Sequence, residues 1–532
     1  MATEALNAEA RDARKTAAGA AGTFALALGY LNEARGDITL GSLDTVAAAH
    51  VLNRLGFGGR PGDLDRVLAR GLDRYIDDQL RPGPDPALDQ RLASFSYLSW
   101  TPAEAYSQYL AYQRTQDNPV ATRLANPIPD LHAQLRSAQI IRGVHSQNQL
   151  LEVMTWFWFN HFNVNLGDDF VQYSGHDYER VLRQNALGKF KNLLAATAHH
   201  PAMMSYLDNY LSTVPRFSGT RLTSGINENY GRELLELHTI SVHGDDYTQD
   251  DVYSAAVILT GWGLGTVPNP TAALPNRTSR GPVFAFTTRD HDTRATQVMD
   301  LRIAAGMQKQ SGDMLLDYLA HHPATAQFIA TKLVRHFVAD DPPQPLVSRV
   351  ADTFMTTDGD VSEMLRTIFA SKEFWNEAFA VKYKNPFQSV VSTLRALDAE
   401  VTDGRSLSTL LNSMGQPQYA CIPPTGWSDR GLEWVNPASH MYRMNFALDL
   451  VSSANTTPIA GVRVDVARLL RNAGVNAGDG AEVAAYFNHS LFGGKLSART
   501  VGAATNAGSS STVPAANRVI GLLLAGPEAQ GR

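Results

Sequence analysis

The sequence lacks several features that would point to common classes of protein. Its single cysteine, Cys421, rules out a disulfide within the chain of 532 residues, and no Cys/His cluster has zinc-finger spacing. A net charge of −6 with scattered basic residues gives no electrostatic reason to bind nucleic acid. No run of about 18 strongly apolar residues predicts a membrane-spanning helix. A phosphate-binding glycine loop, a dinucleotide fingerprint and a nucleophile elbow are also missing, and no organic cofactor is predicted.

The N-terminal segment is rich in alanine and glycine. Residues 16–29 follow three basic residues, as a signal-peptide core does, but they lack a clear cleavage box. We therefore expect a helical extension over residues 1–40. Composition shows no sharp break further along the chain, and 44% hydrophobic residues are typical of a folded protein. We predict a main helical body over residues 41–450 and a C-terminal helical segment over residues 451–532, with a flexible tail at residues 498–515.

Helical patterns bounded by proline and glycine recur along most of the chain. The pattern breaks between Gly263 and Arg302, where the sequence predicts a long loop with one short β-hairpin between Thr266 and Thr293. No longer alternating strand pattern occurs. The sequence therefore predicts an all-α fold, with many helices around one main core and long irregular loops.

One predicted helix is apolar around nearly its whole circumference. It lies within residues 139–165 and contains the run LLEVMTWFWFNHFNVN, so we expect it to be buried. Because buried polar groups need hydrogen-bond partners, its polar residues are either core hydrogen-bonders or members of a site. These residues are Glu152, Asn160, His161 and Asn163.

The segment from Gly225 to Gly263 contains the most polar helical pattern in the chain. On an ideal helix that turns 100° per residue, Glu228, Arg232, Glu233 and Glu236 fall within an arc of about 140°. One interpretation is a solvated face with ion pairs at i, i+4 spacing. The other is an internal cavity in which Arg232 keeps neighbouring carboxylates ionised.

The same segment predicts a helix boundary. His238 lies about 160° from Glu236 on the ideal helix, so the two could bind one metal ion only if the helix ended there. Gly244 is a candidate C-cap, and Thr248 with Asp251 resembles a capping box that starts an apolar, buried helix. Asp250 is one of the few polar groups of that next helix.

Several longer motifs follow one another along nearly the whole chain. They are HVLNRLGFGGRPGDLDRV, MTWFWFNHFNVN, RQNALGKFKNLLAATAHHPAMMSYLDN, NENYGRELLELHTISVHGDDYTQDDV with LTGW, HDT, HHPATAQFIATKL and PPTGWSDRGLEW. With these motifs the sequence resembles the bacterial family catalogued as domain of unknown function 1800. The resemblance implies a largely helical protein that is exported or periplasmic, and it implies no particular activity. The chain departs from the family pattern at two places. The family motif HDTGPK contains a lysine, whereas this chain reads HDTRAT, so either Arg294 replaces that lysine or its charge is lost. Phe159 stands where a histidine is common in the family.

Three hypotheses for the function follow from these residues. The first is a hydrolase that cleaves a glycan or another polar polymer by acid/base catalysis with Glu228, Glu233, Glu236, Asp250 and His291. In that case Asn160, His161, Arg232, Trp262 and Trp427 would bind the substrate. The second is an enzyme with a divalent metal ion bound by His161, Glu236, His238 and His291 in some combination. The third is a non-catalytic binding or assembly protein of the envelope, in which the polar motifs fix helical packing.

Two spatial predictions accompany these hypotheses. The buried helix over residues 150–163 is expected to pack against the helix over residues 227–239, so that Asn160 and His161 approach Glu228 and Arg232. The functional pocket is expected over Glu228, Arg232, Glu233 and Glu236. We expect the loop 264–300, which carries His291, to close it.

Overall fold

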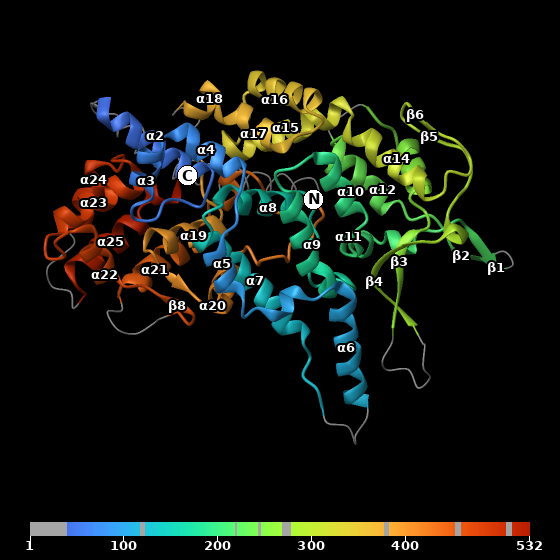
Figure 1. Ribbon diagram of the computed structural model, residues 1–532, viewed down its shortest axis with the longest axis horizontal. Helices are drawn as coiled ribbons and strands as arrows, with labels where there is room; N and C mark the ends of the chain where they lie inside the picture. The colour runs from blue at the N-terminus through green and yellow to red at the C-terminus, as the bar shows by residue number, and fades with distance from the viewer. Residues whose placement is uncertain are drawn as a thin grey trace, which may run out of the picture. The chain divides into compact units, whose positions relative to one another are not determined.

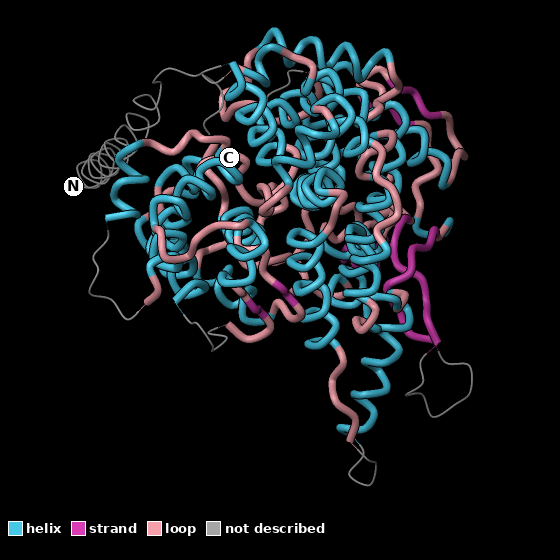
Figure 2. The backbone as a smooth tube through the Cα atoms, turned by 60° about the vertical axis from the view of Figure 1, so that its left-hand side comes forward, coloured by secondary structure: helices cyan, strands magenta, loops and turns pink. Residues whose placement is uncertain are grey.

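The computed structural model describes residues 40–117, 123–218, 221–242, 246–268, 278–376, 382–452, 459–506 and 513–532 (Figure 1). It is 63% helical, and the described residues form 24 α-helices with only small two-stranded antiparallel sheets (Figure 2). The predicted all-α fold is therefore confirmed. The predicted N-terminal extension, except Leu40, and the candidate C-cap Gly244 lie outside the described residues.

The chain divides into two compact units, each built from separate stretches of sequence. Unit 1 comprises residues 1–77, 380–416 and 430–532, and unit 2 comprises residues 78–379 and 417–429. These boundaries differ from the predicted cut near residue 450, because α21 (Pro437–Ser452) and α25 (Ala515–Ala525) pack together within unit 1. Part of the predicted flexible tail is helical, as α24 (Ala498–Asn506).

Unit 1 is organised around α21 and α25. Helix α19 (Pro386–Ala396) packs on α21, while α23 (Gly480–Phe492) packs on both α2 (Leu40–Arg54) and α25. The other elements of this unit are α3 (Asp63–Arg70), β7 (Glu400–Val401), α20 (Arg405–Ser413), η6 (Gly431–Trp434), β8 (Val462–Arg463), α22 (Val466–Ala473) and η7 (Pro527–Gln530), and α4 (Leu72–Leu80) begins in it.

Unit 2 contains the buried helix that the sequence predicted. All residues of α8 (Gln149–His161) except Leu151 are buried, which confirms the prediction. Helix α9 (Val171–Asn185) packs against α8. The other helices are α5 (Pro86–Leu92), η1 (Ser96–Ser99), α6 (Pro102–Asp117), α7 (Ile128–His145), α10 (Phe190–Ala198), α11 (Pro201–Tyr206), η2 (Asn209–Leu211), α12 (Asn229–Glu233), η3 (Leu234–Thr239), α13 (Gln249–Ile258), η4 (Thr288–Asp290), α14 (Lys309–Ala320), α15 (Pro323–Phe337), α16 (Gln344–Thr356), α17 (Val361–Phe369) and α18 (Lys372–Trp375).

Four two-stranded sheets occur in the described residues, where the sequence predicted one hairpin. The hairpin of β3 (Trp262–Pro268) and β4 (Thr278–Phe286) corresponds to the predicted one. The others pair β1 (Arg216–Ser218) with β2 (Arg221–Ser224), β5 (Thr296–Val298) with β6 (Leu301–Ile303), and β7 with β8. These additional strands have two to four residues each. Strands of that length are too short to give a recognisable alternating pattern, so the sequence did not reveal them.

Candidate functional site

The central motif forms a helix that changes type in its middle. After the α-helical turn of α12, η3 continues as a π-helix. The Thr239 hydroxyl donates to the carbonyl of Leu234 at 2.6 Å, and the backbone N–H of Ser241 donates to the carbonyl of Leu235 at 3.1 Å. The ideal wheel of 100° per residue therefore fails after Glu233. π-helical segments interrupt the regular hydrogen-bond ladder and are frequent at functional sites.

Gly231 sets the distance between this helix and its neighbour α13. A Cβ atom at Gly231 would lie 2.8 Å from the backbone nitrogen of Ala256 and 3.0 Å from the carbonyl oxygen of Val252. Only glycine allows such an approach without moving a backbone. The predicted capping box of α13 is confirmed, because Thr248 and Asp251 bond each other's backbone N–H groups.

The polar arc, which we define as Glu228, Arg232, Glu236 and Gln249, lies on a half-exposed face. Arg232 contacts Glu228 and Glu236 at 3.2 Å each, and Gln249 accepts from Arg232 at 3.0 Å and donates to Glu228 at 2.9 Å. The side chains of Glu228, Arg232 and Glu236 are 38%, 35% and 21% exposed. The i, i+4 ion pairs of the first interpretation are therefore present, and the internal cavity of the second stays a prediction.

Glu233 occupies a different environment from the arc. It is half-buried, and burial together with the nearby Glu236 raises its pKa above the ordinary value, against the opposing effect of Arg232. The charge of Glu233 is also among the causes that, after burial, raise the pKa of the Tyr206 phenol. Glu233 therefore keeps its proton to a higher pH than an ordinary glutamate.

The helices α8 and η3 meet at two buried histidines. His161 Nε2 lies 3.2 Å from the carbonyl oxygen of His238, and the two rings are 6.2 Å apart. Burial and the positive charge of Lys332 lower the pKa of His238 to about 3, and the same causes lower the pKa of His161 well below its ordinary value. Lys332 lies 3.7 Å from Asp429. Both rings are therefore neutral at physiological pH.

Asn160 holds the loop of residues 421–429 against α8. Its amide nitrogen donates to the carbonyl of Trp427 at 2.8 Å, and its amide oxygen accepts from the backbone N–H of Trp427 at 2.6 Å. Gly426 has φ +73°, and a Cβ there would lie 2.2 Å from the carbonyl oxygen of Asn160. The two helices do meet through His161 and His238, but the amide of Asn160 is bonded to Trp427, whereas Arg232 is bonded within the arc.

Asn163 fastens the same loop at its other end. Its amide nitrogen donates to the carbonyls of Cys421 and Pro423 at 3.0 and 2.9 Å. The Tyr206 hydroxyl donates to the carbonyl of Ile422 at 2.6 Å. Asn160, Asn163 and Tyr206 therefore all hold this loop, and three of the sequence motifs meet there.

The three other candidate residues His291, Trp262 and Asp250 have separate local surroundings, two buried and one exposed. The ring of His291 is buried, with Nδ1 2.8 Å from the carbonyl oxygen of Thr260 and Nε2 3.5 Å from the Ser311 hydroxyl. Trp262 is fully buried, stacked 4.5 Å from the His199 ring. A Cβ at Gly312 would lie 2.2 Å from the Trp262 ring, so protein atoms cover it. Asp250 is exposed in the first turn of α13.

The stretch that the sequence predicted as a lid is largely structured. It contains the strands β3 to β5 and the turn η4, and His291 is tied to Thr260 and Ser311. His291 is therefore held by the fold of this stretch, and its role in closing a pocket stays a prediction. Arg294 retains a cation in the HDTRAT motif and pairs with Asp292 at 2.6 Å, with its own side chain 73% exposed.

Phe159 faces a different group of residues from His161. Its ring lies 4.7 Å from Tyr419 and 5.8 Å from Tyr178, inside an aromatic cluster. A histidine at position 159 would therefore face this aromatic cluster and not the surroundings of His161. In the part of the chain that the structure describes, no group of three His, Cys, Asp or Glu side chains is arranged to hold a metal ion. The metal hypothesis thus gains no support from geometry.

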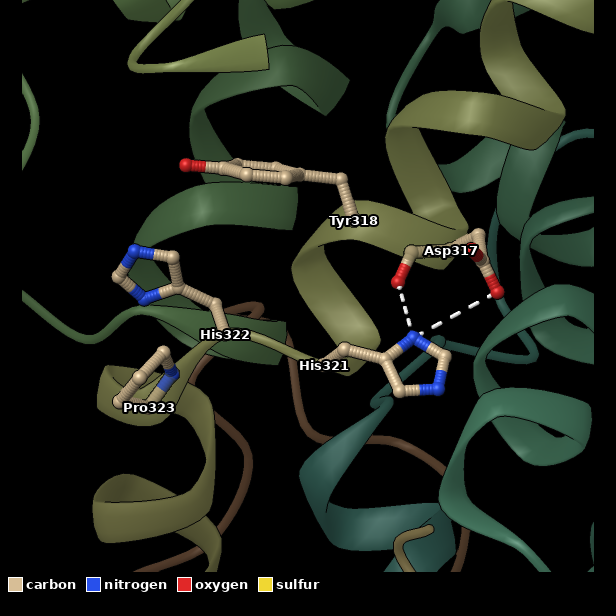
Figure 3. A pocket seen from close by; sticks show the side chains of 5 residues that line it. All are labelled: Asp317, Tyr318, His321, His322 and Pro323. Atoms are coloured by element: carbon tan, nitrogen blue, oxygen red, sulfur yellow. Dashed lines mark hydrogen bonds and ion pairs between the residues drawn. The ribbon is translucent and has the colours of Figure 1, made fainter. Parts of the chain in front are cut away.

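A shallow hollow of about 450 Å³ lies at the junction of α14 and α15 (Figure 3). His321 turns toward Asp317, whereas the His322 ring lies beside Tyr318, 5.6 Å away. His322 Nδ1 accepts from the backbone N–H of Ala324 and so caps α15. The arc residues do not line this hollow.

Sequence reasoning missed Tyr206, Lys332 and Asp429 as neighbours of the central motif. Each stands within a quoted motif, in MMSYLDN, ATKL and GWSD. Their adjacency depends on tertiary contacts between segments far apart in sequence, which a single sequence does not encode locally. The signal that existed was the concentration of polar residues inside otherwise apolar motifs.

Comparison with known proteins identifies one family. The sequence model of a family described as protein of unknown function (DUF1800) matches residues 50–531. No curated protein and no solved structure matches the chain. Within the described residues, no helix is both long enough and apolar enough to cross a bilayer.

Proposed function

The chain belongs to the family of proteins of unknown function DUF1800, and from the carboxylates of its central motif we propose that it is a hydrolase that uses acid/base catalysis. Glu233 is the general acid, and Glu236, which contacts Arg232, is the base. The substrate is a saccharide or another polar polymer.

The observation that carries this proposal is the unequal environment of two neighbouring glutamates. Burial and Glu236 raise the pKa of Glu233, while Glu236 contacts the Arg232 guanidinium at 3.2 Å. A carboxyl group whose environment raises its pKa is suited to the role of general acid. Hydrolysis of a glycosidic bond needs one protonated and one ionised carboxyl group.

The half-exposed face around these glutamates suits a polar substrate. Arg232 and Gln249 place hydrogen-bond donors beside the carboxylates, and the half-buried Trp427 stands on the loop that Asn160 holds. Trp262 takes no part in substrate binding, since its ring is covered.

The test is to incubate the protein with a panel of soluble glycans and to measure turnover as the release of reducing ends. Glu233→Gln and Glu236→Gln should each lower kcat/KM at least about a hundredfold, the usual contribution of a general acid or base. Wild-type activity should fall as pH rises and Glu233 loses its proton, and this alkaline limb should disappear in Glu233→Gln. Glu363→Gln, which removes the ion pair of Glu363 with Arg366 on α17, is the matched control and should retain activity. Full activity in both glutamate variants would refute the assignment.

A second candidate is a non-catalytic binding protein. It is favoured by the way Asn160, Asn163 and His291 use their polar atoms to hold backbone segments. Such a protein would bind a glycan of the same panel saturably without cleaving it. The Gln variants would then change affinity alone, whereas the hydrolase proposal requires a loss of kcat.

A further inference from the structure

Unit 1 contains a buried lysine that the proposed hydrolase does not use. Lys384 precedes α19 and is 7% exposed. It lines a small cavity of about 30 Å³ together with Asn53, Gly58, Ser392 and Thr393. The cavity is formed by α2, α19, α23, α25 and their adjoining turns. A space of this size holds one or two waters, or a group of about three heavy atoms.

The amine of Lys384 has an unusual set of neighbours for a lysine. Its Nζ donates to the carbonyl of Ala529 at 2.9 Å. The charged groups that act on it are Arg443 and Arg532, both cations, and with burial they lower the pKa of Lys384 to about 7. A substantial fraction of the amine is therefore uncharged and nucleophilic at neutral pH.

Arg443 adds buried positive charge beside the lysine. It is 2% exposed and donates to the carbonyl of Lys384 at 2.8 Å, to Gln530 at 3.3 Å and to the Ser439 hydroxyl at 3.4 Å. All three acceptors are neutral oxygens. Its Nη2 is buried and has no hydrogen-bond acceptor among the described residues. A buried cation in such surroundings stabilises an anion placed nearby.

From this cavity and the buried Arg443 beside Lys384, we propose that Lys384 is a carbamylation site that reversibly binds carbon dioxide. The Nζ lone pair attacks the carbon of CO2 and forms an N–C bond, one C=O electron pair moves to oxygen, and a proton leaves the nitrogen for solvent. The balance is one amine and one CO2 giving one carbamate anion and one proton. The carbamate offsets the charge of Arg443 and Arg532 and adds three heavy atoms, which the cavity accommodates.

The test is ¹³C NMR of the full chain in ¹³C-bicarbonate, together with alkylation that traps carbamates for peptide mass spectrometry. Wild type should show one carbamate on the Lys384 peptide, with an occupancy that rises from pH 6 to pH 8 because only the uncharged amine reacts. Lys384→Met should abolish it. Lys382→Met, which replaces another buried lysine two residues away, should retain it. Arg443→Gln should lower the occupancy at least about threefold at fixed CO2, since one stabilising charge is lost.

Two outcomes would overturn the proposal. One is a wild-type Lys384 peptide without adduct at pH 8, which the peptide mapping decides even if the Met variant fails to fold. The other is binding of inorganic phosphate that depends on Lys384, without any carbamate on the Lys384 peptide. The cavity would then be a simple anion-binding site. Neither result bears on the hydrolase proposal, whose residues all belong to unit 2.

Discussion

Two polar groups flank the π-helix in unit 2, and they use their hydrogen-bonding capacity differently. In the first, Asn160 is buried and both ends of its amide bond the backbone of Trp427. In the second, Arg232 contacts the side chains of Glu228, Glu236 and Gln249 on a half-exposed face. The first group joins two distant chain segments, whereas the second joins neighbouring turns of α12, η3 and α13.

The two groups differ in the energy that they contribute to the fold. A buried amide that loses its partners leaves unsatisfied groups and costs about 1 to 3 kcal/mol for each of them. Ion pairs between partly exposed side chains contribute about 0 to 1 kcal/mol. The buried group therefore stabilises the fold, while the arc contributes little to stability and can exchange its partners for those of a substrate.

Among the substitutions, the largest expected effect comes from Gly426→Ala, which disrupts the contact between Gly426 and Asn160. The methyl group would lie 2.2 Å from the carbonyl oxygen of Asn160, at a φ of +73° that alanine adopts only with strain. Since the nearest atom belongs to the backbone and the φ is strained as well, we expect a loss of at least about 3 kcal/mol in the free energy of unfolding. Urea denaturation measures this loss.

Gly306→Ala is the matched control for that variant. Gly306 also lies in unit 2 and has φ +83°, but a Cβ there meets nothing within 4 Å. It should therefore cost only the strain of the positive φ, about 1 kcal/mol. Equal losses in the two variants would mean that the contact between Gly426 and Asn160 contributes nothing.

Two histidines of unit 2, His238 and His132, should also make the protein sensitive to acid. The pKa of His238 falls to about 3 and that of His132 to about 4, in both cases first because of burial. A histidine in the unfolded chain has a pKa near 6.5, so protons bind the unfolded state first. Stability is therefore full above pH 6.5 and falls, as pH decreases toward 4, by about 1.4 kcal/mol per pH unit for each of the two histidines.

Two variants sharpen this expectation. His238→Met keeps an apolar side chain in the buried position and should remove one histidine's share of the slope. His321→Gln should leave that slope in place, because His321 is 44% exposed and bonds to Asp317 and Asp358 raise its pKa instead. Unfolding midpoints at pH 7 and pH 5 give the comparison. An unchanged slope in His238→Met would show that other groups cause the acid sensitivity.

Much of the fold followed from local patterns in the sequence. The buried helix α8 was predicted from an apolar run without a polar face, and the capping box of α13 from Thr248 and Asp251. The short sheets were missed because their strands give no periodic signal. The π-helix was missed as well, because its i+5 hydrogen bonds arise from packing that side-chain periodicity does not record.

The candidate site followed from the sequence only in part. The ion pairs of Arg232 with Glu228 and Glu236 were one of the two interpretations, since i, i+4 spacing fixes them locally. His291 was expected on a lid, and the structure ties it to Thr260. The contact between Asn160 and Trp427 joins residues 267 positions apart, and a single sequence carries no local trace of it.

The smallest expected effect on stability comes from the arc itself. Glu228→Gln keeps an oxygen acceptor for Arg232 and Gln249 while removing one charge, so the free energy of unfolding should fall by no more than about 0.5 kcal/mol. The loss should shrink further in 1 M salt, where charges beyond about 3 Å are screened. Glu363→Gln, with a comparable exposed ion pair on α17, should behave in the same way. A loss above about 1.5 kcal/mol in Glu228→Gln alone would mean that the arc holds the fold as the buried group does, and the energetic argument for its role in catalysis would fail.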